Sequence, residues 1–426
     1  MTTTMPAGVK TASALGDAYR AVRATTAWIC EPLATEDYVV QAMPDTSPTR
    51  WHLAHTTWFF ETFVLKPSVA GYRPFHPDFE YLFNSYYNAV GPQWSRPRRG
   101  VLTRPSVDDV RRYRKHVDAA MLDLLGDDGR YDAGVVVLGL NHEQQHQELI
   151  VTDLKYMLSC NPLHPVYRPA AAAAAPSGWA PDLSWMPGPE GVIEVGFAGN
   201  GFAFDNESPR HRVFVDRFEL ASRAVSVGEF REFMADGGYR RPELWLADGW
   251  NTVREREWAA PLYWEEHGGD WQHMTLSGLR SVADAEPVTH VSYYEADAYA
   301  RWAGYRLPTE TEWEAIAAPQ PLEGNFLESG RFHPAPAVAD ASGHPAQLFG
   351  DVWEWTQSAY SPYPRYRPAA GALGEYNAKF MCNQLVLRGG SCATPKSHIR
   401  ATYRNFFPPD ARWQFSGIRL ARDAAR

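Results

Sequence analysis

The chain has 426 residues, too many for one ordinary domain, and 45% of them are hydrophobic, which supports a large core rather than a disordered chain. The formal net charge of −9 argues against nucleic acid or an anionic membrane as a partner. Four cysteines without a Cys-x-x-Cys pair provide no disulfide framework, and no apolar stretch approaches membrane-spanning length. The first residues show no basic region followed by an apolar run, so we expect a reduced, cytoplasmic protein.

The first 160 residues contain four segments with the apolar spacing and length of bundle helices. They predict an up-and-down four-helix bundle. In the second segment we expect Ser47 to be the N-cap, with Pro48 at the first helical position. A long aromatic loop over residues 67–105 separates the second segment from the third. The four helices are expected at about 13–34, from 47 to just before Pro67, at 106–125 and at 133–160.

The fourth helix carries two histidines, His142 and His146, that lie four residues apart and therefore share a face with Gln145. The run matches the His-Glu-x-x-His pattern of zinc proteases through Glu143. The downstream histidine of that class is missing, however, which argues against a protease. The two histidines predict half of a metal site, and the alternative is a pair that cross-links the bundle without metal.

The second helix supplies the missing ligand in this prediction. Trp51, His55 and Phe59 lie on one face, whereas His52 is expected to point elsewhere. His55 is therefore the preferred third nitrogen and His52 the competing candidate. Three neutral imidazoles suit zinc or ferrous iron and leave open positions for substrates.

After residue 190 the pattern changes to short strands separated by loops rich in Gly, Pro and Trp. Residues 161–189, with seven prolines and an alanine run at 170–175, are predicted to connect two domains. Capping boxes at Ser292–Glu295 and Thr309–Glu312 predict helices to about residues 303 and 318. Strands are expected at 191–196, 212–220, 385–389 and 417–421.

Four segments of the second half resemble the signature segments of formylglycine-generating-enzyme-like domains, which have a C-type-lectin-like fold. They are residues 304–314, 350–356, 387–391 and 417–422. The copper-binding cysteine pair of the true enzymes is not matched, and Cys392 is read as a core thiol.

The histidine segments 51–55 and 142–146 resemble a DinB-like four-helix bundle. Together, in this order, the two halves resemble the iron-dependent sulfoxide synthases of ergothioneine biosynthesis. The expected fold is thus a multidomain α and α+β protein: a DinB-like metal-binding bundle at 10–165, a linker at 166–189 and a C-type-lectin-like, formylglycine-generating-enzyme-like domain at 190–424.

The resemblance implies a non-haem iron(II) oxidoreductase that uses O2 to join a thiol to hercynine and leaves a sulfoxide. The iron ligands of the family map to His55, His142 and His146, and Gln145 maps beside the hercynine imidazole. Asn405 and Phe406 match positions that hold hercynine. The small-molecule substrates implied are hercynine, cysteine and O2, while a monomer and a homo-oligomer both stay open.

The resemblance also bears on which thiol is the substrate. One branch of the family uses γ-glutamylcysteine, and two of its residues bind the glutamyl group. Phe407 and Ala411 replace an Asp and an Arg there, which favours cysteine, although Arg412 offers compensation. Arg96 and Arg98, with Arg99, are candidates to hold the carboxylate of the thiol substrate, or are solvated loop charges.

Catalysis also needs a proton or hydrogen donor. Tyr86 and Tyr87 resemble the active-site tyrosines of one branch, with simple packing as the alternative. Another branch uses a tyrosine of the second domain, for which Tyr360, Tyr363 and Tyr366 are candidates. Alternative functions are the same reaction with γ-glutamylcysteine, a zinc-dependent thiol-S-transferase, and a lectin-like binding module.

Overall fold

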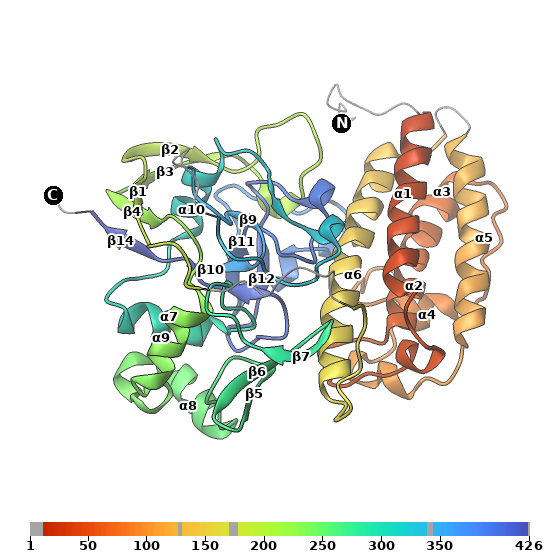
Figure 1. The fold of residues 1–426 in the computed structure, drawn as a ribbon. Helices are drawn as coiled ribbons and strands as arrows, with labels where there is room; N and C mark the ends of the chain where they lie inside the picture. Colours follow the sequence, from red (N-terminus) through yellow and green to blue (C-terminus); the bar gives the residue numbers. More distant parts are fainter. Residues whose placement is uncertain (1–11, 127–129, 170–177, 339–343, 425–426) are drawn as a thin grey trace. The chain divides into compact units, whose positions relative to one another are not determined.

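The structure is a computed structural model that describes residues 12–126, 130–169, 178–338 and 344–424 (Figure 1). It divides into two compact units that are each discontinuous in sequence. The predicted boundaries at 165 and 190 remain a prediction of where the domains begin and end, and the alanine run at 170–175 lies outside the described residues. Unit 1 takes Met1–Asn161, Ala198–Phe204 and Arg367–Ala378, and unit 2 takes Pro162–Phe197, Asp205–Tyr366 and Lys379–Arg426.

Unit 1 contains the predicted four-helix bundle. Helix α1 packs on α5 and α6, and α2 packs on the same two helices. Every residue of α2 is buried, as expected for a helix that is covered by neighbours on all sides. The four helices are α1 (Ala12–Cys30), α2 (Thr49–Phe60), α5 (Val107–Leu125) and α6 (Ala133–Ser159) (Figure 1).

Two expectations for the second helix are wrong. Pro48, not Ser47, is the N-cap residue of α2, and it provides no side-chain cap. Ser47 instead donates its backbone N–H to Asp153 and accepts a hydrogen bond from Arg99. The helical path also continues past Pro67. It does so through a π-helix (Glu61–Leu65), a widened turn of the kind found near functional sites, and α3 (Lys66–Ser68).

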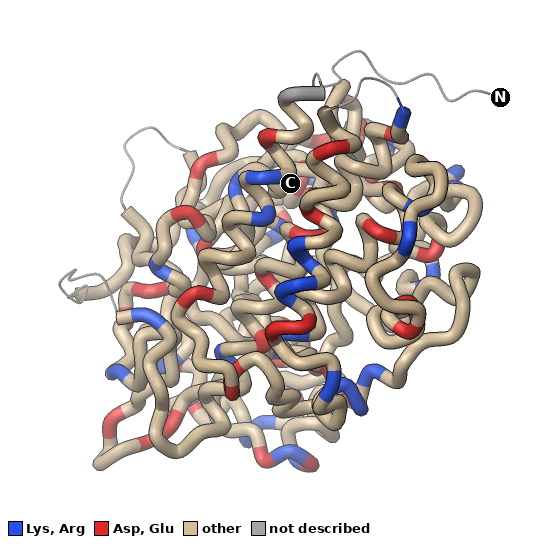
Figure 2. The backbone as a smooth tube through the Cα atoms, turned by 90° about the vertical axis from the view of Figure 1, so that its right-hand side faces the viewer, with Lys and Arg blue, Asp and Glu red and all other residues tan. Residues whose placement is uncertain are grey.

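The predicted loop over 67–105 contains two short helical turns, α4 (Phe79–Phe83) and the 3₁₀ helix η3 (Arg96–Val101). A further turn, η1 (Thr35–Tyr38), follows α1, and η8 (Ala372–Glu375) belongs to this unit as well. The solvent side of α5 carries charges of both signs, with Asp108 paired to Arg111 at 3.2 Å. Lys and Arg are interspersed with Asp and Glu along the backbone (Figure 2). None of the described helices has the length and apolar character needed to cross a membrane.

The described residues of unit 2 form five small sheets, among them one of four strands in the order β12-β11-β10-β13. β10 and β13 pair in parallel, whereas the other two pairs of this sheet are antiparallel. The sheets are β1 (Trp185–Pro187), β4 (Phe218–Ala221) and β14 (Ala421–Asp423); β2 (Gly191–Val195) and β3 (His211–Val215); β5 (Trp264–His267), β6 (Asp270–Thr275) and β7 (Gly278–Ser281); β8 (Gly324–Asn325) and β9 (Phe349–Gly350); and β10 (Trp353–Ala359), β11 (Leu385–Arg388), β12 (Asn405–Phe407) and β13 (Ser416–Gly417).

Two of the four predicted strands are confirmed by β2 and β11, and two differ. The run 212–220 is divided into β3 and β4. Most of 417–421 lies between β13 and β14. The carbonyl of Ile418 accepts from Val225, which lies outside the strands, and that of Leu420 accepts from Ala221 at the end of β4.

Both predicted capping-box helices of unit 2 are confirmed as α9 (Tyr293–Trp302) and α10 (Glu310–Ala317). A third capping box, Ser226 with Glu229, opens α7 (Val227–Ala235). The remaining helical elements are α8 (Ala247–Glu255), η4 (Asp205–Glu207), η5 (Gly238–Arg240), η6 (Pro242–Leu244), η7 (Leu327–Ser329), η9 (Ala378–Phe380) and η10 (Lys396–His398).

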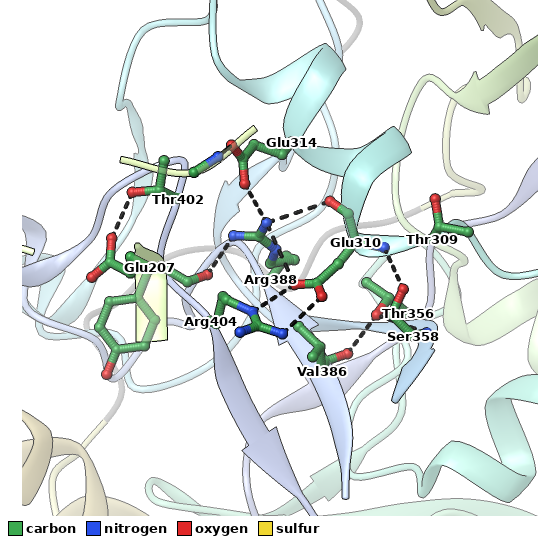
Figure 3. Close-up of polar contacts among 12 residues, drawn as sticks. Glu207, Thr309, Glu310, Glu314, Thr356, Ser358, Val386, Arg388, Thr402 and Arg404 are labelled. Carbon is green, nitrogen blue, oxygen red and sulfur yellow. Dashed lines mark hydrogen bonds and ion pairs between the residues drawn. The ribbon is translucent and has the colours of Figure 1, made fainter. Parts of the chain in front are cut away.

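A buried ion-pair network fixes the four-stranded sheet on α10. Figure 3 shows Arg404 and Arg388 pointing toward two carboxylates of that helix, Glu310 and Glu314. Arg404 donates to Glu310 at 2.8 and 2.9 Å. Arg388 also donates to the carbonyl of Tyr403 at 2.8 Å. The charges compensate one another, so the segment that leads into β12 is held firmly in place.

Candidate metal centre

Three histidines of unit 1 converge in the buried centre of the bundle. His55 comes from α2 and His142 and His146 from α6, and each offers one ring nitrogen within 4.8 Å of the others. The Nε2 atoms of His55 and His142 are 3.2 Å apart. The three ring centroids are separated by 4.6 to 4.9 Å. This convergence follows the helical spacing, which places one histidine of α2 opposite two histidines of α6.

The surroundings keep these rings neutral. Burial lowers the pKa of His142 to about 3, and burial together with His142 lowers the pKa of His55 and of His146 well below the usual value. His55 donates from Nδ1 to the carbonyl of Phe83 at 2.6 Å, which leaves the lone pair on Nε2. Neutral imidazoles with inward lone pairs are the form that a metal ion binds, so the donor set fits a divalent transition metal.

Aromatic rings hold His55 on both faces. Trp51 stacks on it at 4.5 Å with an interplanar angle of 12°, and Trp58 stacks at 5.4 Å and 17°. The guanidinium of Arg99 lies 3.3 Å from the centroid of the Trp51 ring. The ring of His55 therefore has little freedom to turn away from His142.

His52 does not point elsewhere, and that expectation is wrong. Its Nδ1 lies 2.8 Å from Nδ1 of His146, and its Nε2 lies 3.0 Å from Oδ2 of Asp153. Both ring nitrogens are therefore engaged by neighbours, and His52 is not part of the three-histidine group.

Glu143 faces away from the histidine group and into the bundle. It accepts hydrogen bonds from Arg23 at 2.8 Å, from Thr26 at 2.7 Å and from Arg114. Burial favours the neutral acid, but Arg114 and Arg23 outweigh it and lower the pKa of Glu143 to about 2. An ionised carboxylate held by two guanidinium groups is structural, and it is not the general base of a zinc protease.

Gln145 meets a residue that the sequence did not single out. The hydroxyl of Tyr376 donates to Oε1 of Gln145, and the Tyr376 ring lies 5.6 Å from that of His142. Phe204 also stacks on Tyr376, at 5.4 Å and 17°. The sequence could not indicate this contact, because 231 residues separate Tyr376 from Gln145. The residues just before Tyr376 form only a short 3₁₀ turn.

The segment that carries Tyr376 is tied to the loop that carries Tyr86 and Tyr87. Glu375 accepts backbone hydrogen bonds from Asn88 at 3.1 Å and Ala89 at 2.7 Å. Tyr86 stacks on Tyr87 at 4.7 Å and meets Tyr376 edge-on at 6.4 Å.

Burial of Tyr86 and Tyr87 affects the ionisation of both hydroxyls. Tyr87 is fully buried and packs against Trp58 and Phe63. Burial raises the pKa of Tyr86 to about 12 and that of Tyr87 well above its usual range, so both are protonated at neutral pH.

The arginines of η3 differ sharply in environment. Arg96 and Arg98 are exposed, and Arg98 lies over the ring of Trp94 at 5.7 Å. Arg99 is buried, and among the described residues its guanidinium donates to two hydroxyls, those of Ser47 and Ser85, at 2.9 and 3.0 Å. Among the described residues no carboxylate forms an ion pair with Arg99. Burial, followed by the neighbouring Arg96, lowers its pKa well below the usual value.

The other predicted substrate residues lie in unit 2. Phe406 of β12 stacks on Tyr360 at 4.0 Å and 10°, and Asn405 accepts a hydrogen bond from the backbone N–H of Phe406. Phe407 packs edge-on against Trp413. Arg412 is paired with Glu295 at 2.9 Å and lies over the Trp258 ring, so its charge is already matched.

The three alternative tyrosines also lie in unit 2 and have partners there. Tyr360 accepts a hydrogen bond from Asn206 at 2.9 Å, and Tyr366 donates to Asp205 at 2.6 Å. Tyr363 packs under the guanidinium of Arg404. Cys392 is buried, as expected of a core thiol.

A second group of possible ligands occurs among the described residues, His273 with Glu286 and His333. Both oxygens of Glu286 accept from Arg280, at 2.8 and 2.7 Å, and Oε2 lies 3.0 Å from Nε2 of His333. Burial raises the pKa of Glu286, but His333 and Arg280 outweigh it and lower the value. The guanidinium supplies the positive charge that a metal would bring, so we interpret this group as an ion-pair network.

Comparison with known proteins finds two family models that match different parts of the chain. The DinB superfamily model matches residues 18–150, and the sulfatase-modifying factor enzyme 1-like domain model matches residues 181–346 and 339–424. The formylglycine-generating enzyme of Streptomyces coelicolor is 30% identical over 310 residues, which cover 61% of this chain and 96% of that protein.

Relatives that match nearly the whole chain carry both parts. The hercynine oxygenase of Mycolicibacterium smegmatis is 32% identical over 416 residues, which cover 90% of this chain and 92% of that protein. The hercynine oxygenase of Mycobacterium tuberculosis is 33% identical over 410 residues, which cover 89% and 92%. Similarity of this extent, together with three buried histidines in the DinB-like bundle, confirms the predicted resemblance: the chain belongs to the hercynine oxygenase family.

Proposed function

We propose that this protein is an iron(II)-dependent hercynylcysteine sulfoxide synthase, which joins hercynine to cysteine at the expense of O2. The observation that carries the proposal is the group of neutral, buried histidines His55, His142 and His146 in a chain of the hercynine oxygenase family. Three nitrogen donors without a carboxylate leave a bound cation with its full charge, which favours an anionic thiolate beside it. When bound, ferrous iron supplies the redox chemistry by which O2 is reduced.

The reaction balances with one O2 per product. The C2–H bond of the hercynine imidazole and the S–H bond of cysteine break, and a C–S bond forms. One oxygen atom enters the sulfoxide and the other leaves as water with the two hydrogens. The four electrons that O2 accepts come from C–S coupling and from sulfur oxidation.

Tyr376 and Gln145 have the chemistry to orient the imidazole of hercynine. Gln145 offers an amide that both donates and accepts, and Tyr376 holds that amide through its hydroxyl. The Tyr376 ring contacts that of His142, which makes Tyr376 our leading candidate for the proton donor. Tyr86 and Tyr87 stay candidates for the same role, and the ring of Tyr86 lies 6.4 Å from that of Tyr376.

Arg99 is the arginine best suited to hold a substrate carboxylate. Its guanidinium donates to two hydroxyls and lies over the Trp51 ring, and no carboxylate among the described residues forms an ion pair with it. An incoming carboxylate would therefore compensate a buried charge that is otherwise costly. Arg96 and Arg98 are exposed, and their contribution is expected to be that of screened surface charges.

The smaller thiol, cysteine, is our proposal for the sulfur donor. Phe407 and Ala411 carry no charge, and Arg412 is already paired with Glu295. A γ-glutamyl group would bring an additional carboxylate and ammonium without a matching partner at these positions. Hercynine is proposed to contact Asn405 and the aromatic surface of Phe406, because a trimethylammonium group is attracted to ring faces.

Anaerobic reconstitution of the metal-free protein tests this proposal. We expect O2 uptake when hercynine and cysteine are added to the iron(II) form, with about one O2 consumed per product. The zinc form should consume none. Turnover of the zinc form without O2 uptake would show a thiol-S-transferase instead. His142→Asn should abolish iron binding and O2 uptake, whereas His267→Asn, at an exposed histidine of unit 2, should change neither.

A further inference from the structure

A chain of hydrogen bonds leads from the backbone of residue 47 to His146. The N–H of Ser47 donates to Oδ2 of Asp153 at 2.8 Å, and the same oxygen lies 3.0 Å from Nε2 of His52. The opposite ring nitrogen of His52 lies 2.8 Å from Nδ1 of His146. All three side chains are buried, and Asp153 follows His146 by two turns of α6.

Ligation of a metal by His146 would set the direction of these hydrogen bonds. If His146 binds through Nε2, its Nδ1 carries the proton and donates to Nδ1 of His52. The lone pair of His52 is then on Nδ1, and Nε2 of His52 donates to the carboxylate of Asp153. This tautomer leaves the lone pair of His146 on Nε2, the ring nitrogen that takes no part in this series of hydrogen bonds.

We propose that Asp153 and His52 are positioning residues for the metal centre, which hold His146 in the Nδ1–H tautomer with Nε2 available to the metal. The inference rests on the proposed function, because it assigns His146 as a ligand. The three histidines are supported unequally. His55 donates to the carbonyl of Phe83, His146 donates to the His52–Asp153 pair, and Nδ1 of His142 has no hydrogen-bond partner among the described residues.

A carboxylate that bonded directly to His146 would have to lie next to it, whereas here His52 spans the distance between Asp153 and His146. Asp153 lies on the same helix as His146, and His52 from α2 bridges the two turns between them. The bridge therefore ties the ligand to both helices of the site. Outer partners of ligating histidines typically change metal affinity by about 10- to 100-fold when removed.

The test is metal affinity, measured by competition of iron(II) or cobalt(II) with a chelator under anaerobic conditions. His52→Leu and Asp153→Leu should each weaken binding by about 10- to 100-fold, and the double variant should lose little more. His52→Gln should restore most of the affinity, because its amide can accept from His146 and donate to Asp153. The absorption bands of bound cobalt(II) should shift in the leucine variants.

Gln147→Leu is the matched control. Gln147 is a buried polar residue of the same helix, and it donates to the carbonyl of Val22 and to Thr26 of α1. Its loss should lower thermal stability but leave metal affinity and the cobalt spectrum unchanged. If the leucine variants do not fold, Asp153→Asn keeps the volume and should weaken binding several-fold.

Three outcomes distinguish a failure of the positioning role from a failure of the proposed function. Wild-type affinity in folded His52→Leu and Asp153→Leu, or in Asp153→Asn, would overturn the positioning role and leave the proposed function intact. Equal loss in His52→Leu and His52→Gln would also overturn it, since the bulk of the side chain would then matter rather than its hydrogen bonds. A protein whose metal affinity depends on this pair but whose wild type shows no O2-dependent turnover would refute the proposed function alone.

Discussion

The side chains around the three histidines act by different physical means. Trp51 and Trp58 enclose the ring of His55, while the carbonyl of Phe83 fixes its tautomer. Within the described part of the chain Nδ1 of His142 has no hydrogen-bond partner, and its ring packs against Phe59 and Tyr376. Rings that are buried, neutral and prevented from turning lose little entropy when they bind a metal, which favours a preorganised site.

Tyr376→Phe tests the leading candidate for the proton donor. Removal of the hydroxyl abolishes its hydrogen bond to Gln145. It also removes the proposed proton donor beside the histidine group. We expect kcat for sulfoxide formation to fall by about 10²-fold or more, with iron affinity unchanged.

The matched control for this variant is Tyr81→Phe, which removes the same atom from an exposed tyrosine of unit 1. It should leave kcat unchanged. Full activity of Tyr376→Phe, with activity lost in Tyr86→Phe instead, would assign the donor role to Tyr86.

At the scale of elements, the bundle depends on close approach between α2 and α6. Gly139 of α6 faces two rings of α2, and a Cβ at this position would lie 2.6 Å from Phe60 and 2.9 Å from Phe59. Both rings are fully buried and cannot move aside freely. Gly139 therefore sets how closely the helix of His142 and His146 can approach that of His55.

Gly139→Ala should destabilise the protein by about 1 to 3 kcal/mol, because overpacking outweighs the gain in helix propensity. The free energy of unfolding from denaturant titration measures this. Gly16→Ala in α1 is the matched control, since its Cβ would meet only the flexible end of Arg20 at 3.6 Å. That change should stabilise by up to about 1 kcal/mol, and stabilisation by both changes would contradict the packing argument.

Helix spacing explains which parts of the site could be predicted. His55, His142 and His146 lie on helices whose periodicity is local, so their common face was readable from the sequence. The role of His52 was missed because α2 is buried on all sides and both of its faces meet a neighbour. Tyr376 and Phe204 could not be predicted, since they join unit 1 through two short segments distant in sequence.

At the scale of the whole molecule, many charges are buried in unit 2 and their balance makes stability depend on pH. Arg419 and Glu354 form a fully buried pair, and the network of Arg388, Arg404 and their carboxylates is nearly as enclosed. His398 of η10 is buried as well. Its Nε2 lies 3.1 Å from the hydroxyl of Tyr403.

Burial, followed by the charge of Arg400, lowers the pKa of His398 well below its usual value. The unfolded chain binds a proton at this histidine below about pH 6.5, and the folded protein does not. Stability from His398 is thus present above about pH 6.5 and is lost as pH falls, by up to about 1.4 kcal/mol per pH unit.

His398→Gln should therefore lose less stability between pH 7 and pH 5 than the wild type. Denaturant midpoints at several pH values provide the measurement. The exposed His267→Gln should keep the wild-type pH dependence, and an equal pH dependence in wild type and His398→Gln would contradict the assignment.

The central claim, iron(II)-dependent sulfoxide synthesis from hercynine and cysteine, is tested most directly by the mass of the product formed with ¹⁸O2. The iron(II) protein is mixed with hercynine and equal amounts of cysteine and γ-glutamylcysteine, and ¹⁸O2 is then admitted. We predict that the main product is the hercynine–cysteine adduct with one ¹⁸O atom. A product without ¹⁸O would contradict O2-dependent sulfoxide formation, and a predominant γ-glutamylcysteine adduct would contradict the choice of thiol.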